Sequence, residues 1–145
     1  MQVQDIMTEN PACCAPDATL QAAATLMAEN DCGEIPVLDE QRRPVGVVTD
    51  RDIACRAVAQ GKGPDTRVQA VMSSPIVTVT PDMSLEDCCD MMEQNQVRRV
   101  PVVDESGTCC GMVSQADIAQ NAPDHESARL VRELSQPMAE PATAG

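Results

Sequence analysis

Apolar residues recur at the spacing i, i+3, i+4, i+7 in two stretches of the chain. The positions are Leu20, Ala23, Ala24 and Met27 in the first stretch, and Leu85, Cys88, Cys89 and Met92 in the second. This spacing places the apolar side chains on one face of a helix that packs on a sheet. Thr19 and Ser84 each follow a Pro-Asp pair and are the predicted N-caps. We therefore expect two amphipathic helices, with both cysteines of the second one buried.

Short apolar runs bounded by polar residues predict the strands. Each predicted helix is preceded by an extended piece, "PACCA" at 11–15 and "PIVTV" at 75–79. Each is followed by two runs separated by four polar residues, which suits a hairpin. The runs are "EIPVLD" and "PVGVVT" in the first half, and "RVPVVD" and "CCGMVS" in the second. A second helix follows each hairpin, the first closed by Gly61 as its C-cap and the second cut short by Pro123.

The two halves are copies of one another. Laying residues 16–54 over 81–119 without a gap gives 14 identities in 39 positions, and "VQDIMTENP" upstream matches "VQAVMSSP". Such self-similarity decides the architecture, because one copy alone leaves a sheet face uncovered and two copies should pack together. We expect a first repeat at 1–61, a linker at 62–67, a second repeat at 68–122 and a tail at 123–145. The tail begins with an amphipathic helical stretch at 124–135, and its end is expected to be disordered.

Composition narrows the classes of function. The chain has 145 residues, a formal net charge of -13 and no aromatic residue. An acidic surface repels phosphate backbones and anionic lipid heads, which disfavours general binding to nucleic acid or membranes. There is no secretory signal and no apolar run long enough to span a bilayer, so we expect a cytoplasmic protein.

The eight cysteines occur as three adjacent pairs plus Cys32 and Cys55. In a cytosolic chain they indicate packing, redox chemistry or metal binding. There is no Cys-x-x-Cys, and the single histidine, His125, lies in the polar tail. We favour buried packing, and leave a redox or metal role open.

The ends of the two hairpins carry the motif with chemical content. "GVVTDRDIA" (46–54) and "GMVSQADIA" (111–119) both place a Thr or Ser three residues before an Asp, between a buried strand and a helix. One interpretation is an ordinary helix cap. The repeat order, together with Gly-h-h-(Thr/Ser)-x-x-Asp, where h is apolar, resembles the cystathionine-β-synthase (CBS) domain, as a stand-alone tandem pair of the bacterial type. The resemblance covers the chain up to about residue 122.

This resemblance implies an α+β fold of two β-α-β-β-α repeats packed with pseudo-two-fold symmetry. It implies a regulatory module without catalysis that binds AMP, ADP, ATP, S-adenosylmethionine or NAD, and pairs into a homodimer of four repeats. Two clefts between the repeats would hold the ligands. The first would use Thr49 and Asp52 with Val77, Val97 and Arg98; the second would use Ser114 and Asp117 with Cys13, Cys32 and Gly33.

The chemistry suits such a ligand. A carboxylate can accept hydrogen bonds from both ribose hydroxyls, and a hydroxyl with free N–H groups at a helix start can hold a phosphate. Arg51 and Arg98 favour a phosphate in the first cleft. The second copy has Gln115-Ala116 in place of Asp50-Arg51, so we expect a tighter first cleft and a weak or empty second one.

The sequence leaves three rival functions to consider. Intrinsic catalysis is disfavoured, because Asp50 and Asp52 should point apart and no histidine lies near them. A thiol or metal sensor would use Cys13, Cys14 and Cys32, which the family alignment places near one cleft. An interaction adaptor whose clefts have decayed is the third. The sequence does not identify the effector protein that would receive the signal.

Overall fold

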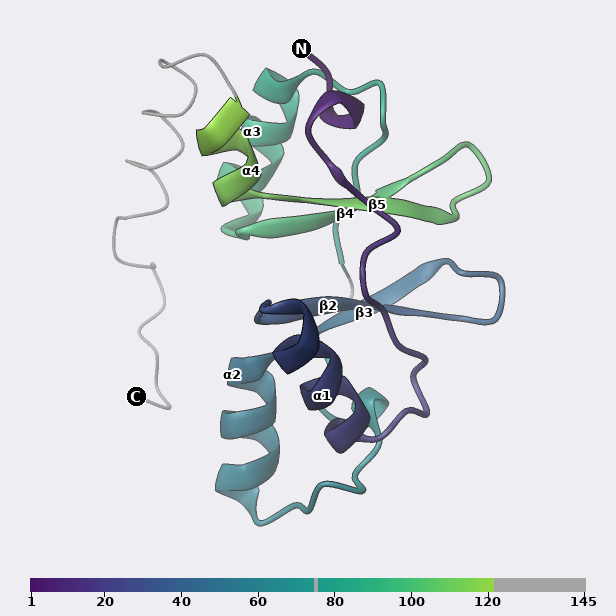
Figure 1. Cartoon of the computed structure of the whole chain (residues 1–145), viewed down its shortest axis with the longest axis vertical. Helices are drawn as coiled ribbons and strands as arrows, with labels where there is room; N and C mark the ends of the chain where they lie inside the picture. The colour runs from purple at the N-terminus through teal and green to yellow at the C-terminus, as the bar shows by residue number, and fades with distance from the viewer. Residues whose placement is uncertain (75, 122–145) are drawn as a thin grey trace. The chain divides into compact units, whose positions relative to one another are not determined.

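The chain passes between two structural units, and each unit combines segments from both halves of the sequence. The computed structural model describes residues 1–74 and 76–121 (Figure 1). Within these residues, unit 1 contains Met1–Glu9, Val77–Glu105 and 110–121, and unit 2 contains Asn10–Ile76 and Ser106–Cys109. The predicted tail helix at 124–135 lies outside the described residues.

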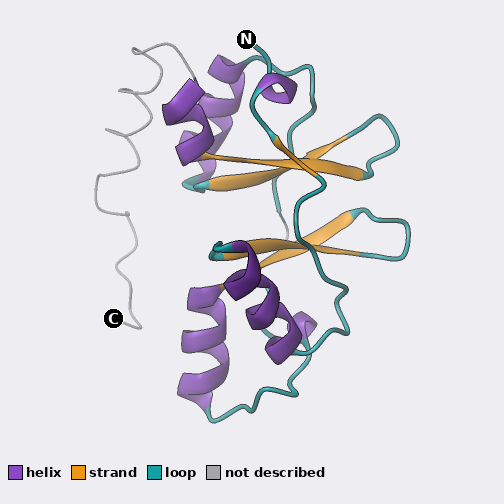
Figure 2. Cartoon of the chain, viewed as in Figure 1, coloured by secondary structure: helices purple, strands orange, loops and turns teal. Residues whose placement is uncertain are grey.

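Unit 2 is built from a hairpin with helical segments before and after it in the chain (Figure 2). Its elements are α1 (Leu20–Asn30), β2 (Glu34–Leu38), β3 (Pro44–Thr49), α2 (Asp50–Asp52), a π-helical stretch η2 (Ile53–Ala57), and the 3₁₀ turns η3 (Val58–Gln60) and η4 (Val68–Ala70). β2 and β3 pair antiparallel, with Glu34 opposite Thr49. The predicted C-cap Gly61 adopts φ 78°, a left-handed conformation that glycine reaches without a Cβ penalty.

Unit 1 repeats this plan with an added strand from the N-terminus. Its elements are η1 (Val3–Asp5), β1 (Thr8–Glu9), α3 (Leu85–Asn95), β4 (Arg99–Val103), β5 (Cys109–Ser114) and α4 (Gln115–Asn121). The strand order is β1-β5-β4, and β1 pairs antiparallel with β5, with Thr8 opposite Met112. The mixed helix and strand content of both units confirms the predicted α+β class.

The predicted starts of the two amphipathic helices are confirmed. The Thr19 hydroxyl accepts a hydrogen bond from the Ala22 N–H at 3.1 Å, and the Ser84 hydroxyl accepts one from the Asp87 N–H at 3.0 Å. Each bond satisfies one of the N–H groups that a helix start leaves without an intrahelical partner. The apolar patterns therefore begin where the sequence predicts.

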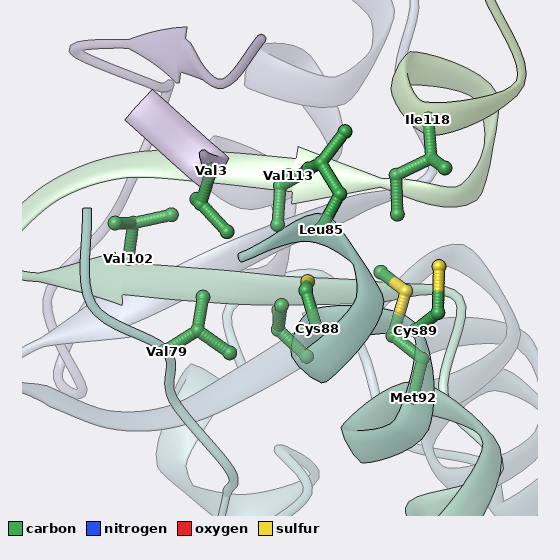
Figure 3. Packing of buried hydrophobic residues seen from close by; sticks show 10 residues of the cluster. Val3, Val79, Leu85, Cys88, Cys89, Met92, Val102, Val113 and Ile118 are labelled. Carbon is green, nitrogen blue, oxygen red and sulfur yellow. The ribbon is translucent and has the colours of Figure 1, made fainter. Parts of the chain in front are cut away.

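Each helix buries its apolar face in the core of its own unit. Cys88, Cys89 and Met92 are 0% exposed, and Figure 3 shows them with Val79 and Leu85 in the core of unit 1. The packing interpretation of this cysteine pair is confirmed. The prediction that Ala24 is buried is wrong: it is exposed and lines an open cavity of about 360 Å³ together with Leu20 and Ile53.

The predicted first strands are also wrong as strands. Of the stretch 11–15, Cys14 alone forms a bridge, parallel to Val37; of 75–79, whose residue 75 lies outside the described residues, Val79 alone bridges Val102. Cys14 donates from its N–H to Pro36 O at 3.2 Å and accepts from the Leu38 N–H at 2.9 Å. Pairing does not extend toward the helix, since Pro16 has no N–H to donate to the ladder.

The N-terminal segments of the two repeats are exchanged. The Val3 N–H donates to Met83 O at 2.9 Å, so the N-terminal segment docks on the second repeat, where Val3 is 0% exposed. The Val68 N–H donates to Ala18 O at 2.8 Å, so the corresponding segment, 68–73, docks on the first repeat. The boundaries of the sequence repeats therefore differ from the boundaries of the compact units.

A glycine makes room for each exchanged segment. A Cβ on Gly46 would lie 2.9 Å from Ser73 O, and a Cβ on Gly111 would lie 3.0 Å from Thr8 O. Such contacts leave no space for a side chain, because the crowded atom is backbone and cannot rotate away. The first residue of the Gly-h-h-(Thr/Ser)-x-x-Asp motif is thus explained by packing.

No helix within residues 1–74 and 76–121 is both long and apolar enough to cross a membrane.

Docking of the N-terminal segment should contribute measurably to stability. We expect Val3→Ala to lower the free energy of unfolding by about 2 kcal/mol, because it removes two buried methyl groups and leaves a cavity. Val58→Ala is the matched control, since Val58 is 67% exposed and its truncation should change stability by less than about 0.5 kcal/mol. Urea unfolding monitored by far-UV circular dichroism measures both. Equal effects of the two substitutions would contradict the docking.

Candidate functional site

The two Thr/Ser-x-x-Asp turns have the same geometry, one in each unit. The Thr49 N–H donates to Asp52 Oδ2 at 3.0 Å, and the Asp52 N–H donates to Thr49 Oγ1 at 2.9 Å. The Ser114 N–H donates to Asp117 Oδ2 at 2.9 Å, and the Asp117 N–H donates to Ser114 Oγ at 3.1 Å. These reciprocal bonds form a capping box, so the helix-cap interpretation holds in both copies. The cap fixes the carboxylate and uses only its Oδ2 oxygen.

In unit 2 the Asp52 carboxylate has further neighbours. Asp52 is 9% exposed, and Ser73 Oγ donates to its Oδ2 at 3.5 Å. The Nε of Arg56 lies 3.7 Å from Oδ1, which makes an ion pair rather than a short hydrogen bond. Oδ1 therefore keeps acceptor capacity while its charge is balanced by a nearby cation.

The first residue of each second helix is fixed by the residue that precedes the hairpin. The Asp50 N–H donates to Gly33 O at 2.9 Å, and the Gln115 N–H donates to Arg98 O at 2.8 Å. Gly33 and Arg98 are equivalent positions in the two repeats. A Cβ on Gly33 would lie 2.9 Å from Asp50 Oδ2, so the first copy places a carboxylate directly over this glycine.

The predicted site residues are divided between the two units. Unit 2 holds Thr49, Arg51, Asp52, Cys13, Cys32 and Gly33, and unit 1 holds Val77, Val97, Arg98, Ser114 and Asp117. Thr49 meets Asp52, and Ser114 meets Asp117, as described above. The predicted clefts also require contacts between the two sets, and those contacts stay predictions.

The two arginines predicted to hold a phosphate are exposed. Arg51 lies in the short helix α2, and Arg98 directly precedes β4. Neither side chain forms a hydrogen bond or an ion pair with the residues described by the structure. Among the described residues, both guanidinium groups therefore keep unused donors. Arg99, the next residue in the chain, is half-buried in β4.

Comparison with known proteins decides the family. The family model for the CBS domain matches residues 3–57 and 68–124, which is most of the chain. This chain belongs to the CBS domain family. The CBS domain-containing protein YhcV of Bacillus subtilis is 45% identical over 126 residues, covering 87% of this chain and 89% of YhcV.

Solved structures of other CBS proteins have the same fold. Hypoxic Response Protein I with two coordinated zinc ions has a TM-score of 0.78 and 35% identity, covering 85% of this chain and 100% of that one. The CBS domain pair of MJ0100 in complex with 5'-methylthioadenosine and S-adenosyl-L-methionine has a TM-score of 0.75 and 26% identity, covering 83% and 94%. CBSX2 in complex with AMP has a TM-score of 0.72 and 25% identity, covering 83% and 95%.

Two side chains at the first CBS turn were missed by sequence reasoning. Arg56 lies four residues after Asp52, a spacing that pairs charges on a helix, so the sequence held a signal for it. Ser73 carries no such signal. It reaches Asp52 only because the 68–73 segment docks beside β3, where Ser73 and Val47 exchange backbone hydrogen bonds of 2.8 and 3.1 Å.

Three cysteines of this CBS pair, Cys14, Cys88 and Cys110, have a raised thiol pKa. Burial, with a smaller contribution from Cys13, raises the pKa of Cys14 to about 11. Burial, assisted by Cys89, raises the pKa of Cys88 to about 12. Burial is also the main cause of the raised pKa of Cys110. Since the thiolate is the nucleophile and the metal ligand, a raised pKa disfavours both roles for these three thiols at neutral pH.

Metal binding finds no preformed site in the described part of the chain. Within residues 1–74 and 76–121, no group of three or more His, Cys, Asp or Glu side chains is arranged to hold a metal ion. A structural zinc site takes four such ligands.

The raised thiol pKa values predict a loss of stability at high pH. A group whose pKa is higher in the folded state makes a contribution to stability that is fully present below its unfolded pKa. This contribution is lost as pH rises toward the folded pKa. For Cys88, whose pKa rises from 9.0 to about 12, the loss runs across that interval.

We expect the free energy of unfolding to fall between pH 8 and pH 10.5, with Cys88 contributing on the order of 1–2 kcal/mol. Urea unfolding of the wild type and of Cys88→Ala at both pH values measures the difference. The fall should be smaller in the variant, whatever its stability at pH 8. An identical fall in both proteins would contradict the assignment.

Proposed function

We propose that this CBS pair is a regulatory module that binds an adenosine-containing ligand through the turn Thr49–Asp52. The observation that carries the proposal is the Asp52 carboxylate, which the cap fixes by Oδ2 while Oδ1 keeps acceptor capacity. The relatives MJ0100 and CBSX2 bind 5'-methylthioadenosine with S-adenosylmethionine and AMP, respectively, which supports a ligand of this class.

The ribose is recognised by Asp52. The two adjacent hydroxyls of the ribose donate hydrogen bonds to the Asp52 carboxylate. A hydroxyl that donates to Oδ1 leaves the cap bond from the Thr49 N–H to Oδ2 intact. A carboxylate that is already oriented loses little conformational freedom on binding, which favours affinity.

A phosphate is held by the exposed guanidinium groups of Arg51 and Arg98. The adenine packs on the aliphatic side chains of Val77 and Val97, since the chain has no aromatic residue on which a base could stack. Affinity is accordingly modest, at micromolar to millimolar dissociation constants, or roughly -4 to -8 kcal/mol.

The second turn binds more weakly. Ser114 and Asp117 form the same capping box, with Cys13, Cys32 and Gly33 as proposed partners across the second cleft. The helix that follows, Gln115–Asn121, contains no Lys or Arg. Adenosine can bind there, but a polyphosphate meets little positive charge. ADP and ATP should therefore favour the first turn.

The wider proposal is a non-catalytic cytoplasmic sensor. It forms a homodimer and signals to an effector protein, which responds to the ligand-bound state. Thiol or metal sensing through Cys13, Cys14 and Cys32 is a weaker candidate function. The relative with two coordinated zinc ions supports it, while the raised pKa of Cys14 argues against it.

Calorimetric titration with AMP, ATP and S-adenosylmethionine tests the ligand class. We expect at least one of them to bind the wild type, and Asp52→Asn to weaken binding by about tenfold or more, equivalent to about 1.4 kcal/mol. Asparagine keeps an acceptor for the Thr49 N–H but loses the charge and the second carboxylate oxygen.

Asp117→Asn is the matched control in the other copy and should weaken binding less. Asp65→Asn removes an exposed carboxylate from the surface and controls for net charge. If no adenosine compound binds the wild type at millimolar concentration, the proposed function is wrong. Binding of Zn²⁺ in the same assay, without a response to any nucleotide, would favour the metal sensor instead.

A further inference from the structure

Arg56 joins the Asp52 carboxylate to a segment far away in the sequence. Its Nε lies 3.7 Å from Asp52 Oδ1, and its Nη1 donates to Val71 O at 3.2 Å and to Met72 O at 3.4 Å. One planar guanidinium group therefore contacts both the turn at the start of the helix and the docked 68–73 segment. Arginine suits this role because its donors are held in a fixed fork.

The segment that Arg56 contacts connects the two units. Val68 and Val71 are buried in the core of unit 2, and Ser73 is paired with Val47. The chain enters unit 1 a few residues later, at Val77. Ser73 also donates to Asp52 Oδ2, so the segment contacts the carboxylate both directly and through Arg56.

The other copy lacks this connection. Asn121 occupies the position equivalent to Arg56, and its Nδ2 donates to the backbone carbonyl of Asp117, one turn earlier in the same helix, at 2.8 Å. Thr8 is the equivalent of Ser73, since it lies opposite Met112 as Ser73 lies opposite Val47. The capping box is thus shared by the two copies, while the arginine bridge is specific to the first.

We propose that Arg56 is a positioning residue that couples the Asp52 carboxylate to docking of the 68–73 segment. Fixing the carboxylate holds the guanidinium, and the guanidinium holds the carbonyls of Val71 and Met72. A ribose hydroxyl can donate to Oδ1 without displacing Arg56, because the 3.7 Å ion pair leaves that oxygen's acceptor directions open. Occupation of the first turn therefore tightens the segment that leads into unit 1, and the second turn has no such effect.

Hydrogen exchange of the Val47 and Ser73 amides tests the coupling without any ligand. These two amides bond reciprocally, so they report docking of the segment. We expect Arg56→Asn and Asp52→Asn each to speed their exchange by about three- to tenfold, and the double variant to add little to the larger single effect. Asparagine is the residue that the second copy carries at this position.

Arg67→Asn is the matched control. Arg67 anchors the start of the same segment through an Nη1 bond of 2.8 Å to Asp17 O, and has no bond to Asp52. Its effect on exchange should multiply with that of Asp52→Asn, because the two sites act independently. If Arg56→Asn combines with Asp52→Asn in the same multiplicative way, the coupling is absent and the inference is overturned.

The ligand arm rests on the proposed function and uses AMP. AMP should slow exchange of the Ser73 amide in the wild type and in Arg67→Asn, beyond its general stabilisation of unit 2, and this extra protection should vanish in Arg56→Asn. Extra protection that persists in Arg56→Asn contradicts the inference. If AMP does not bind the wild type, the proposed function is in question, while the ligand-free comparison of variants still decides the role of Arg56.

Discussion

Each repeat of this CBS pair is completed by the N-terminal segment of the other repeat. Residues 1–9 pair with β5 through Thr8, and residues 68–73 pair with β3 through Ser73. The constraint is steric as well as hydrogen-bonded, because Gly46 and Gly111 let the backbone of the exchanged segment approach where a Cβ would collide. Without this docking, Val3 and Val68 would expose apolar surface that is now buried. Exposing such surface to water costs about 25 cal/mol per Å².

The exchange of these N-terminal segments also determines which groups surround the Thr49–Asp52 turn. Local sequence makes the capping box, in which Thr49 and Asp52 satisfy each other's backbone N–H groups. The docked segment then supplies Ser73 to the same carboxylate and the two carbonyls that Arg56 contacts. Capping and ligand binding are compatible uses of one aspartate, because the cap occupies one carboxylate oxygen. Two turns of equal local geometry thereby acquire different surroundings.

Much of the fold follows from local patterns in the sequence. The helical spacing from Leu85 to Met92 predicts a buried face, and burial of the adjacent cysteines follows from it. The N-caps, both hairpins and Gly61 were predicted because each depends on a few neighbouring residues. The predicted burial of Ala24 was wrong, since alanine at this helical spacing is compatible with either burial or an open cavity. The strand predicted at residues 11–15 was wrong, because backbone pairing also depends on neighbours that are distant in the sequence.

The site could be predicted only in its local part. Thr49 with Asp52, and Ser114 with Asp117, are separated by three residues, and their geometry follows from the strand-to-helix turn. Ser73 joins Asp52 across 21 positions through the exchanged segment, which no local pattern reveals. The central claim is that Asp52 receives the ribose of an adenosine ligand, and a crystal structure of the protein with AMP tests it most directly. The account predicts both ribose hydroxyls within hydrogen-bonding distance of the Asp52 carboxylate, with the Thr49 cap intact; AMP bound away from Asp52 would contradict it.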